Sequence, residues 1–153
     1  MIAPQRRGRS IAMSPEERAA FLRRERVCRV ATIGPHGEPH VAPLWFVWHE
    51  DALWLYSLVL SQRWADLERD PRVSVVVDAG ETYDELIGCQ LSGHAEPVGP
   101  VPRLAGPAHP ELDAVEAIFA AKYGAGDDFT ADGKHAWLRI APRKFVSWRF
   151  ANR

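Results

Sequence analysis

Cysteine is scarce in this sequence, whose 153 residues include only Cys28 and Cys89. The two residues form no CxxC pair, and no second pair is present to complete a cysteine metal site. Each lies inside an apolar, strand-like run. We therefore interpret both as small buried hydrophobic residues, without a reactive role.

Net charge and long hydrophobic runs are also lacking. Nineteen Lys and Arg oppose twenty Asp and Glu, so no bulk field favours nucleic acid or an anionic membrane. The longest apolar stretches, such as 42–48, are far shorter than the roughly 20 residues that span a bilayer. The N-terminal MIAPQRRGRS has basic residues but no apolar segment behind them, unlike a secretory signal. We expect a cytoplasmic protein with neither a nucleic-acid nor a membrane partner.

Several catalytic and cofactor motifs are absent. Neither GxGxxG nor GxxxxGK[ST] occurs, which argues against Rossmann and P-loop nucleotide sites. The six histidines show no HExxH and no paired helical spacing, so no metal site is expected. No GxSxG elbow points to a serine hydrolase, and no acid/base pair stands out. We name no catalytic side chain from the sequence.

The length and the apolar content suit one domain with one sizeable core. We expect a flexible tail over 1–12 and a single domain over 13–153. Ser14, Pro15 and Glu17 predict the start of a helix that ends near Arg26, because they match an N-cap, a first helical position and a capping box.

Alternating apolar residues and turn signals predict the remaining elements. Four prolines indicate a loop over 99–110. We expect two more helices at 61–69 and 111–123, and strands at 27–33, 39–49, 53–58, 72–77, 86–98, 134–140 and 144–150, the last two hinged at Pro142. This order favours a mainly β fold with a few helices, a barrel of six or seven antiparallel strands.

A strand ends and a helix begins between Ser57 and Arg63. Ser61 and Gln62 lie at the helix start, where free backbone N–H groups and the helix dipole favour a phosphate. The Arg63 guanidinium could bind the same phosphate through two N–H groups. By chemistry alone, a plain capped helix with an exposed arginine is the favoured explanation of these residues.

Six tryptophans are many for this length. Core packing explains most of them, with Trp45, Trp48 and Trp54 as partners across neighbouring strands. Trp64 and Trp148 could also form the wall of a site for an aromatic ring.

Taken in order, several segments resemble the split-barrel flavin and deazaflavin oxidoreductases, the superfamily of pyridoxamine 5′-phosphate oxidase. Within this superfamily, the chain is most similar to the actinobacterial branch, which uses the deazaflavin coenzyme F420. It covers about 14–98, and the ending PRKFVSW fits the last strand of the fold. The segments are VATI at 30–33, GEPHVAPLWF at 37–46, LWL at 53–55, SQR at 61–63, LERDPRVS at 67–74 and DAGETYDEL at 78–86.

The resemblance implies an FMN-binding split barrel that forms a homodimer with cofactor sites at the interface. It implies that Arg63 binds the cofactor phosphate, that Ser57 and Ser61 donate nearby, and that Trp148 reaches the site of the other subunit. The backbone at Pro43, Leu44 and Trp45 would lie beside the ring. The cofactor-binding residues expected are thus Thr32, Pro43, Leu44, Trp45, Ser57, Ser61, Gln62, Arg63 and Trp148.

Two departures bear on the cofactor. Many relatives have Lys where Arg63 stands, a difference that keeps the charge. They have Leu-Arg-Gly where this chain has Leu86-Ile87-Gly88, so one positive charge is lost and the basic surround is thinner. Coenzyme F420 has a polyglutamate tail that rewards positive charge, whereas FMN needs only a phosphate site.

The activity implied is hydride transfer from coenzyme F420 to an electron-poor small molecule such as an enone, a quinone or a tetrapyrrole. The alternatives are an FMN-dependent oxidase or reductase and a non-catalytic carrier of a flavin or another planar ligand.

Overall fold

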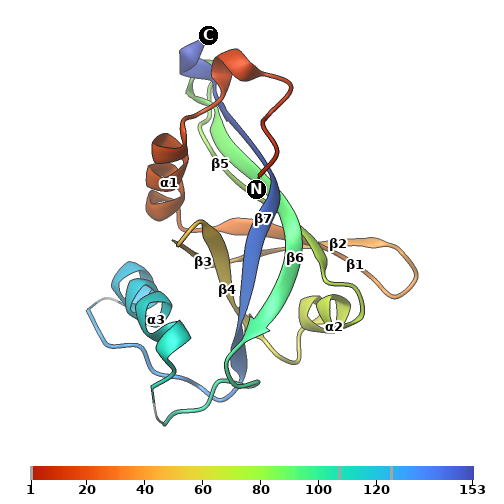
Figure 1. Ribbon diagram of the computed structural model, residues 1–153, viewed down its shortest axis with the longest axis vertical. Helices are drawn as coiled ribbons and strands as arrows, with labels where there is room; N and C mark the ends of the chain where they lie inside the picture. The colour runs from red at the N-terminus through yellow and green to blue at the C-terminus, as the bar shows by residue number, and fades with distance from the viewer. Residues whose placement is uncertain (1, 107, 125) are drawn as a thin grey trace.

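Seven strands form one antiparallel sheet in the computed structural model, which describes residues 2–106, 108–124 and 126–153 (Figure 1). Met1 of the expected tail and Pro107 of the expected loop lie outside the described residues. The strands lie side by side in the order β2-β1-β5-β6-β7-β4-β3. Their bounds are β1 Cys28–Ile33, β2 Pro39–Leu44, β3 Phe46–His49, β4 Ala52–Leu58, β5 Arg72–Ala79, β6 Ile87–Val98 and β7 His135–Arg149.

The sheet curls because its two edges meet at one residue. β2 and β3 are the edge strands at opposite ends of the strand order, yet only Trp45 separates them in the chain. Consecutive Cα atoms are about 3.8 Å apart, so the two edges must lie close together at this point. The result is a split β-barrel, as expected from the sequence.

Three α-helices pack on this barrel: α1 Pro15–Arg24, α2 Gln62–Arg69 and α3 Pro110–Tyr123. The predicted capping box of α1 is confirmed, with Glu17 N donating to Ser14 Oγ at 3.1 Å and Ser14 N donating to Glu17 Oε2 at 2.8 Å. Asp70 and Pro71 follow the last residue of α2, as expected because proline disfavours a helical residue before it.

Two hydrophobic clusters lie on opposite faces of the sheet. The barrel interior contains a row across four strands, formed by Val30, Val75, Leu91 and Phe145, together with residues of α1 and α2. A second cluster joins α3 to the outer face of β3, β4 and β7 through Leu112, Val115, Val47, Trp54 and Trp137. Burial of both clusters holds the helices in place.

Two strand predictions were wrong in their bounds. The stretch 39–49 is two strands, because the chain crosses between opposite edges of the sheet at Trp45. The stretches 134–140 and 144–150 are one strand, β7. Its pairing steps from Lys144 opposite Ser92 to Pro142 opposite Gly93, leaving Arg143 as the extra residue of a β-bulge. A bulge accommodates a proline, which cannot donate to a regular ladder.

The segment before α1 lies along β7. Ala3 bridges to Lys144, the Gln5 amide donates to Ser147 O at 3.1 Å, and Ser147 N donates to Gln5 Oε1 at 3.0 Å. The division of the chain at residue 12 stays a prediction. Among the described residues, no helix is both long and apolar enough to cross a membrane.

Candidate functional site

The first turn of α2 contains the predicted phosphate-binding residues. Ser61 is the N-cap, and its Oγ accepts from Trp64 N at 3.1 Å. Gln62 and Arg63 follow as the first two helical residues. The helix N-terminus therefore lies directly beside the end of β4, where Ser57 is located.

Arg63 is a buried cation without a carboxylate. Its side chain points inward, leaving the residue 7% exposed, and Nε donates to Ser57 Oγ at 3.1 Å. No described carboxylate lies within 4.0 Å of this guanidinium. Burial lowers the pKa of Arg63, and the prediction of an exposed arginine on a plain capped helix is wrong.

The other buried arginine shows how such a charge is usually balanced. Arg103 donates through Nε and Nη2 to the two carboxylate oxygens of Glu116, at 3.0 and 2.9 Å. Buried charges cost several kcal/mol unless they are paired. Arg63 donates to one hydroxyl group and to no described carboxylate, so a bound anion would balance its charge.

Cys28 lies in the interior near Arg63. Burial raises the pKa of this thiol to about 12, although the positive charge of Arg63 acts in the opposite direction. Burial likewise raises the pKa of Cys89 to about 12. Both cysteines are buried, as expected, and a protonated thiol cannot serve as the counter-ion of Arg63.

Thr32 and Gln62 are both engaged by a residue that the sequence analysis missed. Asp66, which is fully buried, accepts from Thr32 Oγ1 at 2.8 Å and from Gln62 Nε2 at 2.8 Å. Arg69 Nη2 donates to the same carboxylate at 3.1 Å. Burial alone would raise the pKa of Asp66, but these hydrogen bonds outweigh it and lower the pKa. The i, i+4 spacing of Gln62 and Asp66 was the one available signal.

Pro43, Leu44 and Trp45 lie where β2 ends. Pro43 pairs with Arg29 and Leu44 with Cys28, both on β1. Because β2 is an edge strand, its other side faces no strand of the described sheet. Backbone groups along this edge are therefore available to a polar ligand, as the resemblance implies.

Trp45 forms an aromatic surface at the barrel crossing. It is 47% exposed, and its ring stacks on that of Tyr123 with centroids 4.3 Å apart and an interplanar angle of 6°. The Tyr123 hydroxyl donates to Arg26 O at 2.7 Å, which anchors the stack. The core interpretation is wrong for Trp45, which lies between β2 and β3, outside both strands, and is confirmed for the buried Trp48 and Trp54. Trp64 is also buried.

Trp148 lies at the far end of the sheet from Arg63. It pairs with Gly88 near the end of β7, whereas α2 follows the end of β4 that pairs with His135 at the start of β7. One chain thus brings together Thr32, Ser57, Ser61, Gln62 and Arg63, and separates Trp148 from them.

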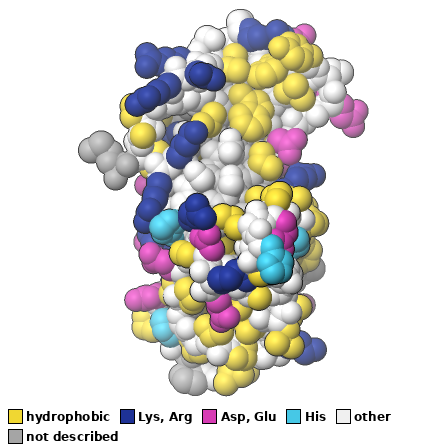
Figure 2. Space-filling view, turned by 90° about the vertical axis from the view of Figure 1, so that its right-hand side faces the viewer, with side chains coloured by type: hydrophobic (Ala, Val, Ile, Leu, Met, Phe, Trp, Pro, Cys, Tyr) yellow, Lys and Arg dark blue, Asp and Glu magenta, His cyan; other side chains and the backbone are white. Residues whose placement is uncertain are grey.

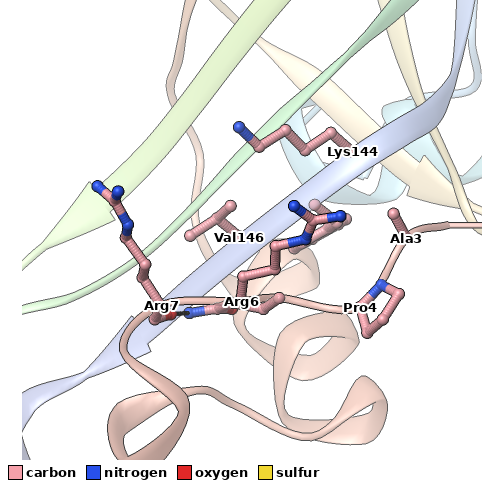
Figure 3. Close-up of a pocket in the computed structure, with 8 residues that line it drawn as sticks. Ala3, Pro4, Arg6, Arg7, Lys144 and Val146 are labelled. Atoms are coloured by element: carbon pink, nitrogen blue, oxygen red, sulfur yellow. Dashed lines mark hydrogen bonds between the residues drawn. The ribbon is translucent and has the colours of Figure 1, made fainter.

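A cavity of about 550 Å³ lies elsewhere, between residues 3–7 and β7 (Figure 3). Its floor is apolar, and Figure 3 shows Arg6, Arg7 and Lys144 around it. It contains none of the predicted site residues. The predicted phosphate site at Arg63 is therefore separate from this cavity.

Residues 14–149 match the family model described as pyridoxamine 5′-phosphate oxidase. A conserved hypothetical protein from Mycobacterium tuberculosis is 30% identical, with a TM-score of 0.70, over 98% of this chain and 92% of that chain. A structure named F420 Reductase is 21% identical, with a TM-score of 0.65, over 86% and 98% of the two chains. The haem storage protein HutZ from Vibrio cholerae is 17% identical, with a TM-score of 0.68, over 90% and 97%. No curated protein matches the chain.

Proposed function

Because the chain belongs to the pyridoxamine 5′-phosphate oxidase family of flavin-binding split barrels, we propose that it is an oxidoreductase that uses coenzyme F420 to reduce an electron-poor small molecule. The observation that carries the proposal is the buried, unpaired guanidinium of Arg63 beside Ser57 and the N-terminus of α2. A cofactor phosphate would supply the missing negative charge.

The residues around Arg63 suit such a cofactor. Arg63, Ser57 and the α2 N-terminus would hold the phosphate, and the free edge of β2 at Pro43 and Leu44 would bind the polar rim of the ring. The exposed face of the Trp45 indole would form one boundary of the site for the cofactor ring. When bound in its reduced form, the deazaflavin would supply a hydride, and the protein would orient the acceptor and exclude water.

FMN is the second candidate cofactor, because Arg63 would recognise either phosphate. The neighbour named F420 Reductase supports the deazaflavin, and the thin basic surround supports FMN. A different candidate function is a non-catalytic carrier of a planar ligand. It is favoured by the exposed Trp45–Tyr123 stack and by the likeness to a haem storage protein.

The sheet offers a surface for the expected homodimer. A row across four strands lies on the face opposite the barrel interior and consists of Arg29, Val76, Gln90 and Val146. Helices α1 and α2 pack against the other face of the sheet. Figure 2 shows hydrophobic side chains gathered on the upper half of one face of the molecule, bordered by Lys and Arg. Trp148 is two residues after Val146 on β7, so its side chain is on the same face of the sheet. From this face it would reach the partner's site.

Fluorescence titration with coenzyme F420, and separately with FMN, tests the cofactor. Trp45 would be quenched by a nearby ring. We expect Arg63→Ala to bind roughly 30-fold more weakly, since a lost charge-assisted contact costs about 2 kcal/mol. Arg24→Ala is the matched control, because Arg24 is exposed at the end of α1 and paired with Glu25. Equal affinity in the Arg63 variant would contradict the phosphate site, and turnover of enones, quinones or tetrapyrroles would separate an enzyme from a carrier.

A further inference from the structure

His40 lies against the buried carboxylate of Asp66. Its Nδ1 is 3.5 Å from Asp66 Oδ2 and 3.4 Å from Thr32 Oγ1, and its side chain is 35% exposed whereas that of Asp66 is fully buried. His40 and Thr32 are paired across β2 and β1. Three elements, β1, β2 and α2, therefore meet at this group.

The hydrogen bonds determine which nitrogen of His40 carries a proton. An ionised carboxylate only accepts, so the single hydroxyl hydrogen of Thr32 is used in its 2.8 Å bond to Asp66. The Thr32 oxygen can then only accept from His40. Nδ1 must be the protonated nitrogen, and Nε2 is the ring nitrogen that does not contact Asp66.

The pair adjoins the predicted phosphate site. Asp66 is one helical turn after Arg63 on α2 and accepts from Gln62 at the helix start. His40 is four residues before Leu44 on β2 and shares its strand face, because side chains alternate along a strand. An acceptor bound over this face of β2, next to the first turn of α2, would lie beside His40.

We propose that His40, oriented by Asp66, is the proton donor to the reduced acceptor. This inference rests on the proposed function. When bound in its reduced form, the deazaflavin would supply a hydride to the β-carbon of an enone-type double bond. The protonated His40 imidazole gives its Nε2 proton to the α-carbon or to the conjugated oxygen, and hydride plus proton complete the two-electron reduction. Solvent reprotonates the partly exposed His40.

The groups facing His40 suit this role. Asp66 from α2 is the carboxylate in contact, and it orients the imidazole through Nδ1. Arg69 approaches from the same helix, but its Nη2 is held by Asp66 Oδ1 and by Ile33 O at 2.7 Å. Thr32 from β1 and Gln62 from α2 are neutral. Asp66 is a positioning residue here, since it acts through His40.

Nitrogen-15 NMR of histidine in the cofactor-free protein tests the arrangement without activity. We expect the His40 resonances, identified by their loss in His40→Gln, to show neutral imidazole protonated on Nδ1 at high pH. Asp66→Asn should shift the ring toward the Nε2-protonated form. A wild-type ring that is protonated on Nε2 alone would overturn the proposal, whether or not the Asp66 variant folds.

Kinetics test the proton transfer. We expect His40→Gln to lower kcat for an enone or quinone acceptor roughly 100-fold, the usual size of a general-acid contribution, with KM and F420 affinity little changed. Added imidazole should restore part of the rate to His40→Gly. His36→Gln is the control, because His36 is exposed in the β1–β2 turn. A wild-type rate in His40→Gln overturns the proton role alone, whereas a wild-type protein that binds neither F420 nor FMN overturns the proposed function as well.

Discussion

The indole ring of Trp148 occupies the space that a Cβ atom would take at Gly88. The ring atoms Cζ2 and Cε2 lie closest to that position, and Val77 O is 2.9 Å from it. Glycine is therefore required by the neighbour across the strand pair and not by its own backbone angles. Gly88 lets a large aromatic ring lie directly on the sheet.

Gly88→Ala should displace Trp148. Because backbone at Val77 blocks relief on the other side, we expect a loss of about 1–3 kcal/mol in the free energy of unfolding, as for other overpacked sites. Chemical denaturation measures the loss, and near-ultraviolet circular dichroism reports the indole. Gly37→Ala is a comparison for the aromatic signal alone, since no atom lies within 4 Å of its Cβ position, whereas its φ of +82° makes any side chain there destabilising. An unchanged aromatic signal in Gly88→Ala would contradict this contact.

Arg63→Met should stabilise the cofactor-free protein. Replacing a buried guanidinium that has no carboxylate partner removes a desolvation cost, and we expect a gain of about 1 kcal/mol. Arg103→Met should do the opposite, because it leaves Glu116 buried and unpaired. Thermal unfolding with and without cofactor measures both. A less stable Arg63→Met apoprotein would show that Arg63 already has a stabilising role in the fold.

Glu116→Gln should destabilise strongly. Glu116 accepts from Arg103 and from Trp137 Nε1, at 3.0 Å in the latter case, and holds the loop after β6 against α3 and β7. Removing one partner of a buried pair costs about 3–5 kcal/mol.

Asp84→Asn provides the surface comparison for Glu116→Gln. Its pair with Arg153 is exposed on both sides, so its loss should cost under about 1 kcal/mol. Urea unfolding of the two variants gives the difference, and equal losses would contradict the burial argument.

The buried thiols predict a pH effect. The unfolded Cys28 thiol ionises near its ordinary pKa of 9.0, whereas burial raises the folded pKa to about 12. Between these values the unfolded state loses the proton and is favoured, so this contribution to stability falls as pH rises above 9. The stability deficit of Cys28→Ala should therefore shrink between pH 8 and 10.

Thiol reagents give an independent measure of the same burial. We expect a disulfide reagent to modify Cys28 and Cys89 in the native protein only as fast as the protein unfolds. Fast labelling of the folded protein at neutral pH would contradict the burial of the two thiols.

Local sequence signals predicted most of the elements. Ser14 and Glu17 define the start of α1 through bonds within one turn, and the alternation of β5 and β6 follows from one buried face. The strand boundary at Trp45 could not be predicted, because 39–49 is continuous in pattern and only the closing of the barrel divides it. The bulge at Arg143 could not be predicted either, because it depends on the pairing of β7 with β6. The sequence therefore indicated a hinge at Pro142, where the strand in fact continues.

For the site, the residue types between Ser57 and Arg63 allowed an anion site, since a helix start, hydroxyls and a guanidinium are local in the chain, but they did not distinguish it from a plain capped helix. Only the tertiary structure decided that Arg63 points inward without a carboxylate, that Thr32 and Gln62 hold Asp66, and that His40 lies over that carboxylate. These relationships join β1, β2, β4 and α2 across long sequence separations. Burial and the pairing of charges depend on what surrounds a side chain in space, which the order of residues alone does not contain.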